Sequence, residues 1–147
     1  MASEARTDPL ALPAQVRRGG LDLWAAIALG GAAGTLARYG LSEALPAAGG
    51  SWHWATLIAN VVGAGALGAI VVLIPNPTAQ PSRLRALLAT GVCGGLTTFS
   101  TMQRELLEMF DHGDGGLAVC YAAVSIVAGL AAVLLAVRLS ERAGRTR

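Results

Sequence analysis

Four apolar segments, each about as long as a bilayer is thick, constrain the fold of this chain more than any other feature. They run from about Leu23 to Leu45, Trp54 to Ile74, Leu84 to Phe110 and Leu117 to Leu139. An α-helix needs about 20 apolar residues to cross the hydrocarbon core. The joints between the segments are rich in proline, glycine and aspartate, which favour turns. The sequence therefore predicts an all-α membrane protein, with four transmembrane helices in one domain over residues 21–140.

Composition and the chain ends narrow the class further. Only 14% of the residues are charged and the net charge is +2, against about 25% charged residues in soluble domains. No basic patch interleaved with aromatics is present, so we expect no nucleic-acid partner.

Residues 1–20 contain no apolar run of signal-peptide length, and we expect a disordered N-terminal tail there and a C-terminal tail over residues 141–147. Cys93 and Cys120 lack ligand-like spacing and are expected to be small buried residues.

The arginines are distributed asymmetrically and predict an orientation. With four spans, the two termini and the loop between the second and third spans share one side. That side holds Arg6, Arg17, Arg18, Arg83, Arg85, Arg138, Arg142, Arg145 and Arg147. Basic residues concentrate on the cytoplasmic side of membrane proteins, so we predict a multi-pass plasma-membrane protein with cytoplasmic termini. Four helices are too few to surround a pore comfortably, which favours a dimer.

The third segment contains a stretch that is poorly suited to a continuous membrane helix. Between Gly91 and Glu105, a glycine pair precedes hydroxyl residues on both sides of Phe99. Backbone at bilayer depth departs from the helix only where protein or a water-filled cavity covers it. We therefore expect this helix to be broken in mid-membrane, beside an ion or substrate path. Carbonyls released there are suitable ligands for a hard cation such as Na⁺. A phenylalanine ring presents a positive edge to an anion, although ordinary packing is the alternative role of Phe99 and Met102.

The first segment carries a small-residue pair and a charge. Gly30 and Gly34 lie four residues apart on one helical face, a pattern typical of close helix packing. Arg38 lies near the end of this span, where a charge is costly unless it reaches water. It is either an interfacial anchor or a cation in an aqueous vestibule that attracts anions, and we favour the vestibule.

Polar residues in the second and fourth segments allow two interpretations each. Asn60 needs partners in an apolar span, so it either bridges helices or lines a pore. Tyr121 and Ser125 are spaced i,i+4 and either line a polar groove or bond across helices. The acidic residues that end the third segment are expected to be mostly solvated, with Glu105 either paired with Arg104 or at a vestibule rim. No catalytic grouping is convincing, and we expect no enzyme.

Three motifs, in this order, closely resemble those of the CrcB/Fluc family of fluoride channels. They are Gly30-Gly-x-x-Gly34-x-x-x-Arg38-Tyr39, then Thr56-Leu-x-x-Asn60-x-x-Gly63, then Gly94-Gly-Leu-Thr-Thr-Phe-Ser-Thr101. The resemblance covers about residues 24–139. It implies an antiparallel dimer of four-helix subunits with two separate fluoride pores and a structural Na⁺ at the dimer interface.

The resemblance also implies roles for particular residues. The Na⁺ is expected on backbone carbonyls at the positions of Gly94 and Thr97, and Arg38 matches the vestibule arginine. The residues expected along the fluoride pore are Asn60, Phe99, Ser100, Thr101, Met102, Tyr121 and Ser125. Met102 stands where the family usually has a second phenylalanine. We expect the methionine to fill that space and the pore to function with an altered conductance.

The resemblance implies passive export of cytoplasmic fluoride, which lowers its toxicity, and two questions stay open beside it. The strong arginine bias is compatible with a heterodimer containing an oppositely oriented paralogue, or with an antiparallel homodimer. The main rival function is a small four-helix proton-coupled exporter of cationic compounds, and a non-conducting assembly subunit is a second rival. The exporter needs an acidic residue deep in a span, whereas Glu43 lies near a helix end and the other acids are expected in loops.

Overall fold

The chain folds into a bundle of long helices. The computed structural model describes residues 14–48, 50–75 and 82–145, and no strand occurs within those ranges. In chain order the elements are α1 (Ala14–Ala44), α2 (Trp54–Leu73), α3 (Arg83–Arg85), the π-helical segment η1 (Ala86–Cys93), α4 (Gly94–Leu96), α5 (Phe99–Asp111) and α6 (Gly115–Arg145). The prediction of an all-α fold is confirmed.

Three of these helices are long and apolar enough to cross a membrane. The candidate spans are Gly20–Ala44 within α1, Trp54–Leu73, which is α2, and Gly115–Gly144 within α6. Many large apolar side chains on them are exposed, including Leu29, Val62 and Leu130. A surface of this kind is stable against lipid rather than water, in agreement with a membrane protein.

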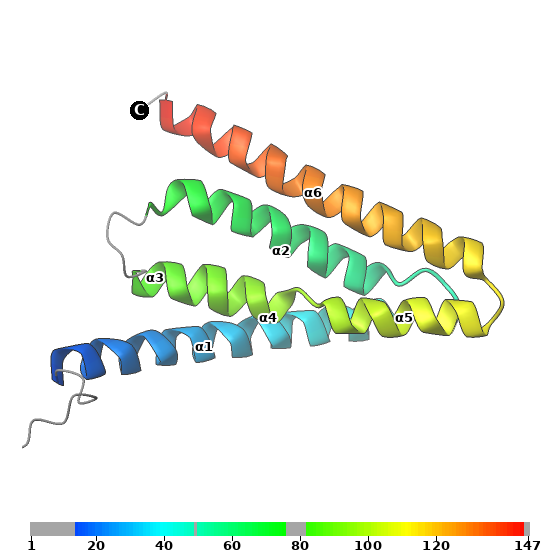
Figure 1. Cartoon of the computed structure of the whole chain (residues 1–147), viewed down its shortest axis with the longest axis horizontal. Helices are drawn as coiled ribbons and strands as arrows, with labels where there is room; N and C mark the ends of the chain where they lie inside the picture. The colour runs from blue at the N-terminus through cyan, green and yellow to red at the C-terminus, as the bar shows by residue number, and fades with distance from the viewer. Residues whose placement is uncertain (1–13, 49, 76–81, 146–147) are drawn as a thin grey trace, which may run out of the picture.

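The third apolar segment is not one uninterrupted helix. The elements α3, η1 and α4 form a first piece that ends at Leu96, and α5 begins at Phe99. Between them the backbone is extended, with φ −78° and ψ 151° at Thr97 and φ −151° and ψ 124° at Thr98. Figure 1 shows this link as a stretch of non-helical ribbon between α4 and α5. Its depth in a bilayer remains a prediction.

The helices pack mainly in two pairs, which are connected by contacts between α2 and η1. The most extensive contacts are those of α2 with α6 and of α1 with η1, and α5 packs on α6. Figure 1 shows the first residues of α1, the start of α3 and the C-terminal end of α6 at the same end of the bundle. The α1–α2 connection and the turn from α5 to α6 lie at the opposite end. A core of Leu57, Met102, Met109, Ala118 and Tyr121 fills the space near that opposite end.

Glycines allow α1 to approach the third segment at backbone distance. A Cβ atom on Gly30 would overlap the carbonyl oxygen of Leu87, and one on Gly34 would overlap that of Val92. From the other side, a Cβ on Gly91 would lie 2.8 Å from the Gly30 Cα. Contacts this short exclude any side chain, so the small-residue pair of α1 is a packing surface, as its spacing indicates.

Both long terminal helices extend beyond the apolar runs that predicted them. Helix α1 begins at Ala14, so residues 14–20 are helical rather than part of a disordered tail. Helix α6 continues to Arg145, so residues 141–145 of the expected C-terminal tail are helical. Arginine, alanine and glutamine are good helix formers, which lets a helix propagate past the membrane-spanning stretch at little cost. Residues 1–13 and 146–147 lie outside the described residues.

Candidate functional site

The extended link is held by an amide from a different helix. The Asn60 Nδ2 donates to the Thr98 carbonyl oxygen at 3.0 Å, and the Thr98 N–H donates to the Asn60 Oδ1 at 2.7 Å. Asn60 comes from α2 and gives the Thr98 N–H the acceptor that it loses by leaving the helix, and its Nδ2 adds a donor to the Thr98 carbonyl. The interpretation of Asn60 as a bridge between helices is therefore correct for these two atoms. The second N–H of the amide stays available for another acceptor.

The Thr98 side chain begins α5. Its hydroxyl accepts from the Thr101 N–H at 3.2 Å, which is the bond of a helix N-cap. The same Oγ1 donates to the Thr101 Oγ1 at 2.9 Å and lies 3.4 Å from the Ser100 Oγ. Thr101 and Ser100 thus belong to the capping arrangement. Thr98 was missed as a site residue, although a threonine three residues before another polar residue at a helix start is a recognisable cap signal.

An open groove of about 370 Å³ lies over this link, and we call it the Asn60 groove. Phe99, one of the lining residues, is 68% exposed. The Ser125 hydroxyl is buried without a hydrogen-bond partner among the described residues. Met102 contributes to the wall and also belongs to the buried core. The groove is lined by Asn60, Ala64, Thr97, Thr98, Phe99, Met102, Ser125, Ile126 and Gly129.

The structure brings only part of the predicted pore set into this groove. Asn60, Phe99, Met102 and Ser125 line it together. Ser100, Thr101 and Tyr121 are not among its lining residues. Tyr121 is fully buried, and its hydroxyl points to Glu105 instead. Tyr121 and Ser125, which are spaced i,i+4 on α6, therefore lie in two different environments.

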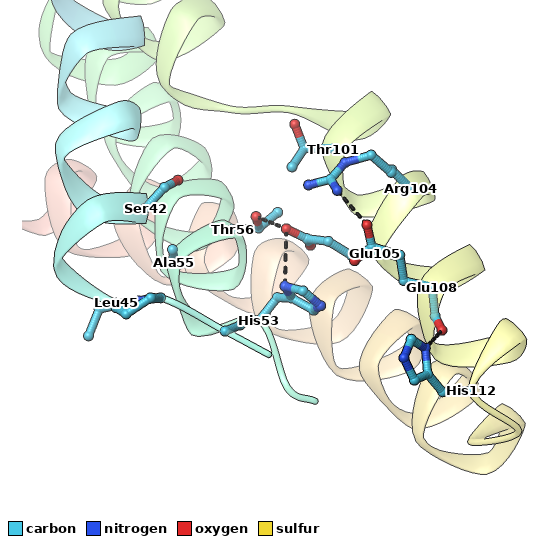
Figure 2. Close-up of a pocket in the computed structure, with 12 residues that line it drawn as sticks. Ser42, Leu45, His53, Ala55, Thr56, Thr101, Arg104, Glu105, Glu108 and His112 are labelled. Atoms are coloured by element: carbon cyan, nitrogen blue, oxygen red, sulfur yellow. Dashed lines mark hydrogen bonds and ion pairs between the residues drawn. The ribbon is translucent and has the colours of Figure 1, made fainter. Parts of the chain in front are cut away.

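A buried carboxylate lies near the end of the bundle that holds the α1–α2 connection and the α5–α6 turn. Glu105 is 4% exposed; its Oε1 accepts from the Thr56 hydroxyl at 2.5 Å, and its Oε2 accepts from the Tyr121 hydroxyl at 2.9 Å. The His53 Nδ1 lies 3.6 Å from Oε1. Figure 2 shows His53, Thr56 and Glu105 converging from two different elements.

Of the two alternatives for Glu105, the pairing with Arg104 is wrong, whereas a position at a vestibule rim stays a prediction. Arg104 pairs with Glu108, one turn further along α5, at 2.5 Å. A sequence signal for the burial exists, because Glu105 follows Met102 by three residues and precedes Met109 by four. That spacing places the carboxylate on the apolar face of α5, where it needs hydrogen-bond partners from α2 and α6.

A second, larger cavity of about 640 Å³ lies beside this carboxylate, and we call it the Glu105 cavity. Figure 2 draws its walls, which come from the end of α1, the α1–α2 connection, the start of α2 and one face of α5. Thr101 lines this cavity rather than the Asn60 groove. The lining residues are Ser42, Leu45, Pro46, Ala47, His53, Ala55, Thr56, Thr101, Arg104, Glu105, Glu108 and His112.

Arg38 contacts the third segment directly. Its Nε donates to the carbonyl oxygen of Gly95 at 3.3 Å, and the side chain is partly buried. It lines neither of the two cavities described above. The guanidinium therefore places a positive charge beside the residues that precede the extended link. Its role in a vestibule remains a prediction.

The backbone around the link contains carbonyls that have lost their helical donors. In a continuous helix the Thr98 N–H would donate to Gly94 and the Thr101 N–H to Thr97. Here the Thr98 N–H donates to Asn60 and the Thr101 N–H to the Thr98 hydroxyl. The carbonyls of Gly94 and Thr97 are the two at which the family resemblance implies a Na⁺. Oxygen ligands of this kind fit a hard cation.

The cysteines differ from expectation in one respect. Cys93 is buried, as predicted, whereas Cys120 is exposed on α6. Its neighbour in sequence, Tyr121, occupies the buried face, so Cys120 is turned outward by the helical period. No group of three potential metal-binding His, Cys, Asp or Glu side chains occurs in the described part of the chain.

Comparisons with known proteins agree with the motifs. The family described as CrcB-like protein, Camphor Resistance (CrcB), matches residues 25–137. A protein of Mycolicibacterium paratuberculosis named fluoride-specific ion channel FluC 1 is 48% identical over 118 residues, which is 80% of this chain and 89% of that protein. The fluoride-specific ion channel FluC of Saccharophagus degradans is 37% identical over 122 residues, or 83% and 92% of the two chains. On this similarity, the chain belongs to the CrcB-like family of membrane proteins.

Proposed function

We propose that this protein is a passive fluoride channel that exports the ion from the cytoplasm. The observation that carries the proposal is the Asn60 groove, which is lined by Asn60, by the exposed Phe99 and by Ser125, whose hydroxyl has no partner among the described residues. These groups are weak donors to an anion. The names of the relatives at 37–48% identity support fluoride as that anion.

The chemistry of the groove suits conduction rather than tight binding. Fluoride is small and strongly hydrated, so its water must be replaced by several donors of moderate strength. Conduction requires that an ion enter a site and also leave it. One hydroxyl, one amide N–H and an aromatic edge meet this requirement better than a cluster of cations would. Arg38, bonded to Gly95, adds positive potential without occupying the groove.

The direction of transport follows from acid–base chemistry and the membrane potential. Hydrogen fluoride is a weak acid that crosses lipid uncharged and dissociates in a near-neutral cytoplasm. A potential that is negative inside then drives the anion outward, with about 2.3 kcal/mol per charge at 100 mV. No further energy source is required for export, which lowers the toxicity of the ion.

We further propose that a structural Na⁺ binds the carbonyl oxygens of Gly94 and Thr97. The loss of their helical donors supports this assignment. When bound, the ion would neutralise the partial charges of these carbonyls and add positive potential near the fluoride path. Two carbonyls from one chain are too few ligands for Na⁺, so the same atoms of a second copy would complete the set.

The open groove also supports a dimer. In a bilayer, the polar residues around the extended link cannot face lipid without a large cost, and Phe99 is 68% exposed. A second chain would cover them. We propose an antiparallel dimer in the plasma membrane with the link in mid-bilayer; for a chain inserted with cytoplasmic termini, the partner is then an oppositely oriented copy or paralogue.

A flux measurement tests the channel proposal. The purified chain is reconstituted into liposomes loaded with fluoride, and efflux is followed with a fluoride electrode in the presence of a potassium ionophore. We expect fluoride efflux without a proton gradient and no chloride efflux under the same potential. Equal permeation of both halides would contradict the assignment.

Glu105 favours a second candidate, a proton-coupled exporter of cationic compounds. The sequence argument against this class was that no acid lies deep in a span, whereas Glu105 is buried and held by three side chains. Dye export driven by a proton gradient, together with an absence of fluoride current, would favour the exporter. A chain that conducts only after addition of a paralogue would instead establish a heterodimer, with this chain as one subunit.

A further inference from the structure

His53 occupies an unusual place in the Glu105 cavity. It precedes α2 as its N-cap residue, and its side chain makes no capping hydrogen bond. The residue is only 9% exposed. Its Nδ1 faces the Glu105 carboxylate at 3.6 Å, and its Nε2 is buried with no partner among the described residues. A buried imidazole nitrogen without a partner calls for a ligand or a water molecule.

The protonation state of His53 decides what that nitrogen can do. A neutral ring that directs its Nδ1–H to Glu105 leaves Nε2 as a bare acceptor, which repels an anion. A protonated ring keeps the Nδ1–H toward Glu105 and gains an Nε2–H donor. The adjacent carboxylate compensates the extra charge, so the site holds a weak rather than a deep anion trap.

The other ionisable groups around His53 already have partners. On α5, Arg104 pairs with Glu108. On α6, the Tyr121 hydroxyl donates to Glu105, with the His53 carbonyl a second acceptor at 3.3 Å. After α5, the His112 Nδ1 lies 2.7 Å from the Glu108 carbonyl oxygen and is exposed. Arg104 and Glu108 therefore balance one another, and the Glu105 carboxylate is left with His53 as the ionisable partner facing it.

We propose that protonated His53, paired with Glu105, is an anion-binding group. It would lie at the entrance of the conduction path beside the α1–α2 connection. Acid then raises the affinity of the entrance for fluoride, and neutral pH lowers it. The entrance would therefore bind fluoride best under the acidic conditions that load a cell with hydrogen fluoride. This inference rests on the proposed fluoride-channel function and adds a site and its control by protons.

The test measures fluoride flux as a function of pH, equal on both sides, in proteoliposomes at low fluoride concentration. Protein-free liposomes supply the leak of hydrogen fluoride, which is subtracted. Because a histidine side chain gains its positive charge on acidification, we expect the apparent affinity to rise about fivefold or more between pH 8 and pH 5.5. H53Q removes the titratable group and should give a flat profile, whereas H112Q, which changes the chain's other histidine, should keep the pH dependence.

The outcomes separate this inference from the channel itself. Fluoride flux with the same apparent affinity at both pH values overturns the role of His53 and leaves the channel assignment intact. No fluoride flux at any pH overturns both. If H53Q fails to fold, the tryptophan fluorescence of the wild-type protein is measured while fluoride is added at pH 8 and at pH 5.5. This fluorescence reports on the site because the Trp52 ring lies 5.2 Å from the Tyr121 ring beside it. A midpoint that is equal at pH 8 and pH 5.5 contradicts the proposal.

Discussion

Asn60 and Thr98 are paired through both ends of one amide, across 38 residues of sequence. The pair replaces the backbone hydrogen bond that the Thr98 N–H loses where the third segment becomes extended, and it adds a donor to the Thr98 carbonyl. A net hydrogen bond contributes about 1 kcal/mol, but a buried backbone group left without a partner costs about 1–3 kcal/mol. The same amide keeps one N–H beside the groove, so its structural role is linked to its proposed role in anion binding.

Replacing Asn60 with Asp tests that link. The carboxylate cannot donate to the Thr98 carbonyl, and its charge repels an anion, so fluoride efflux should fall at least about tenfold, or about 1.4 kcal/mol. The thermal midpoint of the purified protein should also fall. V62A changes an exposed residue on the same helix and should alter neither. Unchanged efflux in N60D would remove Asn60 from the path.

Replacing Phe99 with Ile separates conduction from folding. The ring is 68% exposed in the single chain, so little packing within the chain is lost and the monomer fold should persist by circular dichroism. An aliphatic side chain has no positive ring edge, and we expect fluoride efflux to fall by about an order of magnitude or more. F110I, at an exposed ring near the end of α5, is the matched control. If F99I and N60D both conduct normally, the groove is not the pore.

Ser125 provides a test on α6. Its hydroxyl has no partner to lose among the described residues, so the free energy of unfolding of S125A should equal that of wild type within about 0.5 kcal/mol. Removing the donor should nevertheless reduce fluoride efflux severalfold. S140A lies on the same helix, outside both described cavities, and should conduct like wild type. A matching reduction in S140A would point to a general effect on the helix.

Glycine substitutions on α1 test the packing against the third segment. A Cβ on Gly30 would overlap a backbone carbonyl, whereas one on Gly40 meets nothing within 4 Å. G30A should therefore lower stability by about 1–3 kcal/mol, as overpacked sites do. G40A should be neutral or slightly stabilising, because alanine has the higher helix propensity. Thermal unfolding in detergent compares the two, and equal midpoints would argue against the close approach of α1 and η1.

Removal of Na⁺ tests the assignment of the Gly94 and Thr97 carbonyls. Protein purified and reconstituted with a large organic cation in place of Na⁺ should lose fluoride efflux and unfold at a lower temperature. A ligand present at 100 times its dissociation constant stabilises the folded state by about 2.7 kcal/mol. Restoring Na⁺ should restore both properties. Identical behaviour in the two salts would show that no such ion is required.

Much of this protein could be predicted from the order of its residues. Apolar runs of bilayer length specify helices whatever their partners, because a backbone in lipid must bond to itself. The glycines and hydroxyls after Gly91 predict where the third segment leaves the helix, and the extended residues are Thr97 and Thr98. The motifs around Gly30, Asn60 and Phe99 were enough to indicate the family.

Only the tertiary structure decided which polar groups meet. Whether Asn60 faces a neighbour or a groove depends on the rotation of α2 against the third segment, and no local pattern fixes that rotation. Glu105, His53 and Tyr121 are separated by up to 68 residues, yet the packing of α2 and of α5 against α6 brings them together. Local sequence determines the helices because their bonds are internal, whereas the polar sites arise between helices and depend on how those helices pack.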